Sequence, residues 1–484
     1  MKTALYLMRQ IIVTTGIWLI ALTLGSQAQS PVEPIIWRPP ELIHATEGDI
    51  QQPSVILADP WGRTHLFWVE AVSVALGRED RYPLWYMRLE DGEWTDPVDI
   101  ALSQEGPRTS NPAVVLDDAG RFHVIWGAAR PIEYTTALLD EALNARAWTM
   151  PIAIGGSRVA EADLQMGRNG EIIVAFAEFG EGVYIQQMDL KTGVWSAPSL
   201  IIPPISPEAS PENVLIRVDD EGRWHLIWSE VAYPAGYPPV AAYYAWSDDL
   251  GQGWSPVQRL VSGGYRAEDA VINGEQVHVL LIGQVGVNER LHIYSPDRGQ
   301  TWSPVYRIVP PEMGAGLNGG SLALDSLGRI HAVIGMQSDH SVGHAMWTGS
   351  QWVGLRAISG SVEGTLEDVH MTIAQGNRIQ AMFVSDHQEM WWVEGKIDAP
   401  ELTTPPPPQP TAATPTATAL SIAPIEENVT STPAEPPATP PTPLSQDRPS
   451  SLSTQAALIL GTLPAILFVF GVSMIHVSQS RRRR

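Results

Sequence analysis

Apolar and polar positions repeat along this chain with a period of about 50 residues. In each unit a turn glycine is followed by a short apolar run, and a large apolar side chain stands six residues after the glycine. The glycines are Gly62, Gly120, Gly170, Gly222, Gly274, Gly328 and Gly376. The large apolar residues are Trp68, Trp126, Phe176, Trp228, Leu280, Ile334 and Met382. Short apolar runs bounded by turn residues are typical of β-strands, so the pattern predicts seven β-rich units.

A second pattern lies between these runs, where tryptophans recur and each is followed six residues later by a branched aliphatic residue. The pairs are Trp94 and Ile100, Trp148 and Ile154, Trp195 and Ile201, Trp254 and Leu260, Trp302 and Ile308, and Trp352 and Ile358. Six is an even step, so both side chains of a pair would point to one face of an extended strand. The pattern predicts an outer strand, and with the other apolar runs each unit holds four short strands.

The seventh unit has a turn glycine but no tryptophan pair after it, and the missing pair stands at the other end of the chain. Trp37 and Ile43 precede the first unit and have the same spacing. A ring of four-stranded sheets that closes by lending its first strand to its last sheet explains this permutation, whereas an open solenoid requires different end caps. The sequence therefore predicts an all-β, seven-bladed β-propeller over residues 35–396, closed by an N-terminal strand.

The segments on either side of the repeats have the composition of export and anchoring signals. Residues 1–28 contain Lys2 and Arg9, an uncharged apolar run and a small-x-small site at their end, which predicts a signal peptide; an uncleaved anchor is the alternative. Residues 397–453 are rich in Pro and Thr and predict an unpacked linker, because proline lacks a backbone donor.

After the linker, residues 454–478 are long and apolar enough for one transmembrane helix, and residues 479–484 form a basic cytoplasmic tail. This order predicts a single-pass protein of the cell membrane with its propeller outside the cell. A C-terminal sorting signal that is cut off would have a similar pattern, so retention of the helix stays open.

Composition excludes several classes of function. The chain has no cysteine, so neither a disulfide nor a thiolate contributes to stability or chemistry. The formal charge is −23, and residues 29–450 alone carry −29, which makes nucleic acid an unsuitable partner. No phosphate-binding loop or zinc motif occurs, so we expect no cofactor. Histidines recur three residues after a repeat glycine, and these equivalent positions lie too far apart around a ring to bind one metal ion; they are His65, His123, His225 and His331.

Two turns carry a more specific motif. Ser295, Asp297, Gly299, Thr301 and Trp302 fit the pattern Ser-x-Asp-x-Gly-x-Thr-Trp, and a second copy comprises Ser247, Asp249, Gly251 and Trp254 with Gly253 in place of Thr. The pattern resembles the Asp box, or BNR repeat, of the sialidase-like propellers. In that family the box is a turn between the third and fourth strands of a blade, and its Asp holds backbone amides. Asp and Gly favour such a turn for physical reasons too, so we interpret both boxes as structural.

The resemblance also defines what sialidase chemistry would require. Active members of the family use three arginines, a Tyr and Glu pair and an acidic Asp, with an Arg-Ile-Pro motif near the first blade. In this chain only Arg38-Pro-Pro40 stands near that motif, and it belongs to the predicted closing strand.

Candidate functional side chains are expected in the loops on the opposite face, where one blade leads into the next. The candidate catalytic residues are Arg108, Arg158, Glu161, Asp163, Arg266, Glu367 and Asp368. Tyr233 and Tyr237 lie in a long loop rich in Tyr, Pro and Gly, and we predict that they bind a ligand, because tyrosine offers flat apolar area and one hydrogen bond.

Three functions remain open at this point. The first is recognition of a glycan or a surface protein at the mouth of the propeller. The second is an exo-acting glycoside hydrolase of the sialidase type, for which paired carboxylates would supply the acid and the nucleophile. The third is a scaffold or sensor subunit of a surface complex. An enzyme requires acidic and arginine side chains that converge at the mouth, whereas a scaffold requires an exposed apolar patch on its side.

Overall fold

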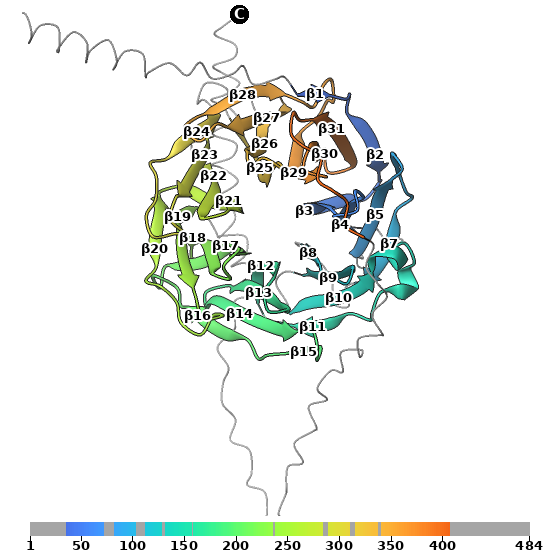
Figure 1. Cartoon of the computed structure of the whole chain (residues 1–484). Helices are drawn as coiled ribbons and strands as arrows, with labels where there is room; N and C mark the ends of the chain where they lie inside the picture. The colour runs from blue at the N-terminus through green and yellow to red at the C-terminus, as the bar shows by residue number, and fades with distance from the viewer. Residues whose placement is uncertain are drawn as a thin grey trace, which may run out of the picture. The chain divides into compact units, whose positions relative to one another are not determined.

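A computed structural model describes residues 35–71, 82–102, 112–127, 131–156, 158–235, 238–283, 289–309, 315–336 and 340–406. These residues form seven antiparallel sheets that surround a central axis as the blades of a ring (Figure 1). The predicted signal peptide, most of the linker, the predicted membrane helix and the basic tail lie outside them. None of the helices in the described ranges has the length and apolar character needed to cross a membrane.

We number the blades 1 to 7 in chain order. Their innermost strands are β3 (Asp49–Ala58), β8 (Ala113–Leu116), β12 (Val159–Met166), β17 (Ala209–Val218), β21 (Tyr265–Asn273), β25 (Ala315–Leu324) and β29 (Leu366–Ala374). The second strands are β4 (Thr64–Ala71), β9 (Arg121–Trp126), β13 (Glu171–Glu178), β18 (Trp224–Ala232), β22 (Gln276–Gly283), β26 (Ile330–Met336) and β30 (Arg378–Ser385). The third strands are β5 (Pro83–Glu90), β10 (Ile132–Leu138), β14 (Gly182–Asp189), β19 (Pro239–Ser247), β23 (Arg290–Ser295), β27 (Ser341–Trp347) and β31 (Glu389–Lys396).

The outer strands differ from the prediction of one continuous strand per blade. They are β6 (Glu93–Trp94) with β7 (Val98–Leu102), β11 (Ile152–Ile154), β15 (Val194–Trp195) with β16 (Ser199–Ile202), β20 (Gln258–Ser262), β24 (Tyr306–Val309) and β28 (Trp352–Ala357). A proline lies between the tryptophan and the aliphatic residue in every blade except blade 6, and it lacks the N–H that strand pairing needs. Only β28 runs unbroken from its tryptophan, because Gly354 and Leu355 stand there instead. In blade 2 the 3-10 helices η1 (Leu139–Glu141) and η2 (Ala145–Ala147) precede the outer strand.

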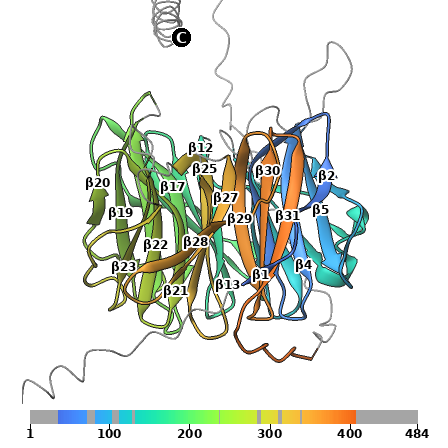
Figure 2. The same cartoon turned by 90° about the horizontal axis from the view of Figure 1, so that it is seen from above.

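Ring closure follows the predicted permutation. The N-terminal strands β1 (Ile36–Trp37) and β2 (Glu41–Ala45) both pair with β31, the third strand of blade 7. The first and last described segments therefore lie side by side in one sheet, as Figures 1 and 2 show. The break between β1 and β2 falls at Pro39 and Pro40, as in the other outer strands that contain a proline.

The hydrophobic core is divided into seven layers, each between two neighbouring blades. The large apolar residues six positions after each turn glycine are at most 1% exposed, as the repeat predicts. One layer joins blade 7 to blade 1, where Trp68 packs with Met382 and Trp392. Because every layer requires both neighbours, the ring buries its core only when it is closed.

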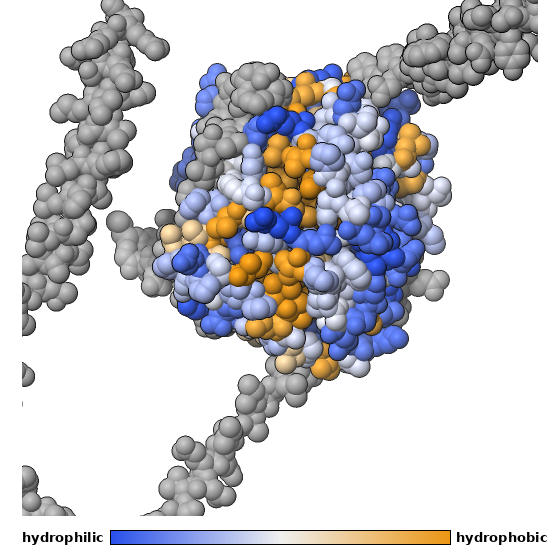
Figure 3. Space-filling view, turned by 90° about the vertical axis from the view of Figure 1, so that its left-hand side faces the viewer, coloured by the Kyte–Doolittle hydropathy of each residue, from blue (hydrophilic) through white to orange (hydrophobic). Residues whose placement is uncertain are grey.

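The outer tryptophans connect neighbouring blades. Trp302 of blade 5 lies 4.9 Å from Tyr244 of blade 4, measured between ring centroids, and Trp195 of blade 3 lies 5.1 Å from Tyr134 of blade 2. Both contacts are edge-to-face, a geometry that adds to the gain from burial alone. On the flank formed by β20 and β24, Figure 3 shows hydrophobic side chains in a broken band between hydrophilic ones.

The recurring histidines are buried within their own blades. Each places Nε2 close to the carboxylate of an Asp at the start of the turn, such as Asp59 for His65 at 3.2 Å and Asp117 for His123 at 3.2 Å. In blades 1, 2 and 4, Nδ1 meets a tyrosine hydroxyl of the third strand, such as Tyr86 at 2.9 Å and Tyr134 at 2.7 Å. In blade 6 it meets His344 Nε2 at 3.0 Å. Burial lowers the pKa of His65, His123 and His225 despite the neighbouring Asp. The histidines are thus packing residues of the repeat.

Candidate functional site

Bulges in the inner strands determine which side chains face the central channel. The pairing with the second strand shifts register in six of the seven inner strands, all except the short β8. Asn213 and Asp368 lie at two of these bulges with φ of +50° and +53°, in the left-handed region. A bulge inserts a residue and re-aims the side chains beside it. Carboxylates expected in loops therefore lie on strands and face the axis.

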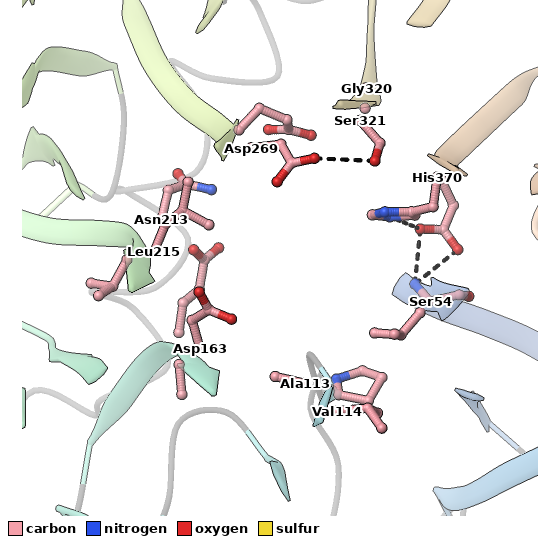
Figure 4. Close-up of a pocket in the computed structure, with 18 of the residues that line it drawn as sticks. Ser54, Ala113, Val114, Asp163, Asn213, Leu215, Asp269, Gly320, Ser321 and His370 are labelled. Atoms are coloured by element: carbon pink, nitrogen blue, oxygen red, sulfur yellow. Dashed lines mark hydrogen bonds and ion pairs between the residues drawn. The ribbon is translucent and has the colours of Figure 1, made fainter. Parts of the chain in front are cut away.

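The channel contains a cavity of about 660 Å³ that is lined by residues of all seven inner strands (Figure 4). Four of the predicted catalytic candidates, Glu161, Asp163, Arg266 and Asp368, lie in its wall. The prediction placed them in connecting loops, which is wrong. They belong to β12, β21 and β29, because the bulges bring strand residues to the axis.

Three aspartates of the wall hold neighbouring blades together. Asp163 Oδ2 accepts a hydrogen bond from the backbone N–H of Ile216 at 2.9 Å, and Asp269 Oδ2 accepts one from that of Leu322 at 2.8 Å. Both oxygens of Asp368 accept from the backbone N–H of Ser54, at 2.9 and 3.0 Å. These bonds join blades 3 and 4, 5 and 6, and 7 and 1. Asp163 and Asp368 thus satisfy buried backbone donors of the next blade.

A different group of side chains covers the wall formed by blades 3, 4 and 5. We call it the glutamate wall: Glu161 of β12, Glu212 of β17, and Arg266 and Glu268 of β21. Arg266 forms an ion pair with Glu268 at 3.2 Å. Three carboxyl groups thus stand near one guanidinium in a channel enclosed by protein.

The enclosure changes the proton affinity of the glutamates. Burial, together with the charge of Glu212, raises the pKa of Glu161 to about 8, and Arg266 offsets only part of this. Burial also raises the pKa of Glu212. Glu161 keeps some accessible surface toward the channel, so a ligand in the cavity could reach it. Near neutral pH this carboxyl group holds a proton and is a hydrogen-bond donor as well as an acceptor.

The wall opposite carries His370 and Ser54. Burial lowers the pKa of His370, but Asp368, whose Oδ1 lies 3.1 Å from Nε2, outweighs burial and raises it. Ser54 is fully buried, and within the described part of the chain its hydroxyl has no hydrogen-bond partner. Figure 4 shows both residues across the cavity from Asp163 and Asn213.

The remaining candidates lie away from the cavity or outside the described residues. Glu367 is buried and its Oε1 lies 2.7 Å from His387 Nδ1. Arg158 is exposed, with its guanidinium 5.8 Å from the ring of Phe179. Tyr233 packs on the same ring in a tilted arrangement, 5.2 Å between centroids, so these three residues form a cluster at the rim. Arg108 and Tyr237 fall outside the described ranges.

Both Asp boxes are turns between the third and fourth strands of blades 4 and 5. Asp297 Oδ1 accepts the N–H of Thr301 at 2.7 Å, and Ser295 Oγ accepts that of Gly299 at 2.7 Å. Asp249 Oδ1 accepts the N–H of Gly253 at 2.7 Å in the other copy. Each carboxylate closes its own turn on the outer side of its blade, away from the channel.

The sequence analysis did not identify Glu212. It also did not separate the aspartates that bond to backbone N–H groups from the glutamates of the glutamate wall. Glu161, Glu212 and Glu268 stand nine, ten and six residues before their turn glycines, so no common position in the repeat identifies them. The bulges insert residues between the glycine and the channel, which destroys the spacing. Among the described residues, no group of three or more His, Asp or Glu is arranged to hold a metal ion.

The fold recurs in known structures at great distance. No protein-family model and no curated protein matches the sequence. An ulvan lyase, a polysaccharide lyase, is 13% identical, with 63% of this chain and 80% of that chain covered and a TM-score of 0.45. NanB sialidase from Streptococcus pneumoniae is 10% identical over 74% and 71%, with a TM-score of 0.43. An α-L-arabinanase from Penicillium chrysogenum, complexed with arabinobiose, is 11% identical over 75% and 98%, with a TM-score of 0.43. At this identity the likeness concerns the propeller fold alone.

Proposed function

We propose that this protein is a carbohydrate-binding propeller that holds its ligand in the central channel. The observation that carries the proposal is the glutamate wall, in which side chains from three adjacent blades converge on a cavity of about 660 Å³. The volume is that of an ordinary small-ligand site. Carboxyl and guanidinium groups form pairs of hydrogen bonds with neighbouring hydroxyls, and a sugar presents such hydroxyls in fixed geometry.

The aromatic cluster at the rim supports the same ligand class. Tyr233 lies beside the start of β17, since its backbone N–H donates to Glu208 O at 2.7 Å. It therefore stands at the end of the ring where the inner strands of blades 3 and 4 begin. The flat face of an aromatic ring suits the apolar face of a sugar. The proposal accordingly assigns Tyr233 to the entrance and the glutamate wall to the interior.

The two Asp-box turns favour the sialidase-like propellers as the group to which this chain is related. The apolar leader and the C-terminal apolar segment support a place outside the cell, on a linker anchored by one membrane helix. Both statements rest on the sequence patterns.

A binding assay of the full-length chain against a glycan array tests the proposed function, followed by calorimetry with the best ligand. We expect saturable binding that falls at least tenfold in Glu161→Gln and Glu212→Gln. Glu221→Gln is the matched control, because Glu221 is an exposed turn residue whose partner is Arg298, outside the channel. Unchanged affinity in both channel variants would overturn the proposal, and silence on the array would favour a protein partner.

Glycoside hydrolysis is a second candidate, and the raised pKa of Glu161 is the observation that favours it. A carboxylic acid that keeps its proton near neutral pH is suited to protonate a leaving oxygen, with Glu212 as the second carboxyl group. The test is turnover of fluorogenic glycosides, α-sialosides first. Activity should decline above about pH 8 and vanish in Glu161→Gln; binding without turnover would leave recognition as the function.

A further inference from the structure

A second cavity lies away from the channel, at a position where blade 2 lacks two side chains that contact the equivalent arginine in blade 4. Four blades share the turn Asp-x-x-Gly-Arg-x-His, in which the arginine follows the glycine directly; the arginines are Arg63, Arg121, Arg223 and Arg329. In three of these blades the guanidinium has a partner. Arg63 donates to Asp59 and Asp140, both at 2.8 Å, and Arg329 donates to Asp325 and to the carbonyl of Asp398, both at 2.6 Å.

Blade 4 shows the fullest set of contacts. Arg223 donates to both carboxylate oxygens of Asp248, at 2.6 and 2.7 Å, and its guanidinium lies 3.9 Å from the ring of Trp246. Asp248 and Trp246 both come from the third strand or the turn that follows it. A carboxylate and a flat ring thus enclose this guanidinium.

Blade 2 replaces both of these groups. His225 pairs with Trp246 in blade 4, whereas the equivalent His123 pairs with Thr136 in blade 2, so threonine stands where the ring would be. Two residues later, Leu138 pairs with Arg121 and takes the place of Asp248. Within the part of the chain that the structure describes, the Arg121 guanidinium has neither a hydrogen bond nor an ion pair.

The missing groups leave a cavity of about 650 Å³ between blades 2 and 3. The cavity is lined by Arg121, Thr136 and Leu138. Methionine and isoleucine side chains, including Met150 and Ile152, form the apolar part of its wall. The cavity therefore joins a guanidinium without a partner to a space that a flat apolar group would fill.

The charged groups around the cavity are of both signs. Asp117 already accepts the N–H of Arg121 at 2.7 Å and lies 3.2 Å from His123 Nε2, as its equivalents do in the other blades. Asp118 and Glu141 are exposed. Lys191 of blade 3 also lines the cavity and stands four residues before its tryptophan, the position of Arg298 in blade 5. Lys191 is exposed as well, so Arg121 is the partly buried cation of the lining, and the partly buried carboxylate beside it, Asp117, is committed to the turn.

We propose that this cavity binds a small monocarboxylate with a flat apolar body. The carboxylate takes the place of Asp248 on the Arg121 guanidinium, and the apolar body occupies the space that Trp246 fills in blade 4. Two charge-assisted hydrogen bonds between the carboxylate and the Arg121 guanidinium orient the ligand, and burial of its ring supplies affinity. The site is separate from the channel and is independent of the proposed carbohydrate ligand.

Calorimetry on the full-length chain with 3-phenylpropanoate as the probe tests the proposal. We expect one saturable site, whose affinity for the probe falls at least about tenfold in Arg121→Gln. The methyl ester of the probe, which has the same body without the charge, should not bind. Phenethylamine, which carries a positive charge in place of the carboxylate, tests whether the site binds a cation instead. Arg168→Gln is the matched control, since Arg168 is a half-exposed arginine of another blade junction, paired with Asp220.

Two further variants restore what blade 4 has and do not depend on removing Arg121. Leu138→Asp supplies an internal carboxylate and Thr136→Trp supplies the ring, so each should abolish binding while the chain stays folded. The proposal is overturned by absence of binding, by equal binding of the ester or the amine, or by full affinity in Arg121→Gln. Glu161→Gln should leave this binding unchanged, which separates it from the channel site.

Discussion

At the scale of single residues, hydrogen bonding divides the carboxylates of the channel into two groups. Asp163, Asp269 and Asp368 accept backbone N–H groups of the next blade. Burial raises the pKa of both Glu161 and Glu212, and the charge of Glu212 adds to the rise at Glu161. The first group holds the ring together, and the second is available to a ligand.

The raised pKa of Glu161 makes stability depend on pH in a definite direction. The folded chain holds the proton up to about pH 8, whereas the unfolded chain releases it near 4.5, so the folded state binds more protons between these values. Stability is therefore fully present below about pH 4.5 and declines as pH rises toward 8. Glu161→Gln should remove this decline and stabilise the chain by about 1–3 kcal/mol at alkaline pH, relative to its effect at pH 5. Urea unfolding at both pH values measures the difference; parallel curves for the two proteins would contradict the prediction.

At the scale of elements, an outer tryptophan packs toward the neighbouring blade, and in every blade except blade 6 it precedes a proline break. The break ends strand pairing and frees the tryptophan to turn toward the preceding blade, as Trp302 does toward Tyr244. The Asp box of blade 5 immediately precedes this tryptophan and holds it in place through the bonds of Asp297 to Thr301. Turn, tryptophan and proline thus act together.

Truncation of Trp302 should test this junction. Trp302→Ala removes a ring that packs against a buried tyrosine and should lower the free energy of unfolding by about 2–4 kcal/mol, while Trp302→Phe should lose about half of that. Denaturant titration measures both. Val305→Ala, at an exposed position of the same connection, is the control and should change stability little. Equal losses in the alanine and phenylalanine variants would show that the indole nitrogen, which donates to Gln258 Oε1 at 3.1 Å, matters more than the ring.

At the scale of the whole molecule, the core has no centre but consists of layers between blades, and the layer between blades 7 and 1 depends on a strand from each end of the ring. The aspartate that joins these blades, Asp368, reinforces the same junction. Closure is therefore a condition for the channel, because its wall needs all seven inner strands.

Deletion of residues 35–45 should open the ring at that junction. Without β1 and β2, the third strand of blade 7 becomes an exposed sheet edge, which favours association with other chains. We expect a melting temperature lower by about 10 °C or more and self-association in sedimentation experiments. A chain that stays monomeric with unchanged melting would show that the closing strands are dispensable. Replacing the exposed residues 403–405, which follow the last strand, serves as the comparison.

The sequence alone determined the number of blades, the closing strand, the buried apolar residue of each blade and the structural Asp boxes. These features follow from strand alternation, turn chemistry and burial, which act within one unit of about 50 residues and therefore leave a repeated pattern. The pattern did not reveal the breaks in the outer strands, although the prolines that cause them, such as Pro97 and Pro304, are visible in it.

Only the tertiary structure decided which carboxylates meet in the channel and which of them hold the blades together. Glu161 and Glu212 come from separate units and reach the axis through bulges that shift their spacing, so no local pattern relates them. The same holds for Arg121, which has the sequence of a paired arginine and is distinguished only by Thr136 and Leu138 on the neighbouring strand. Local rules build each blade, whereas the chemistry of a site depends on contacts between strands and blades that the order of residues does not record.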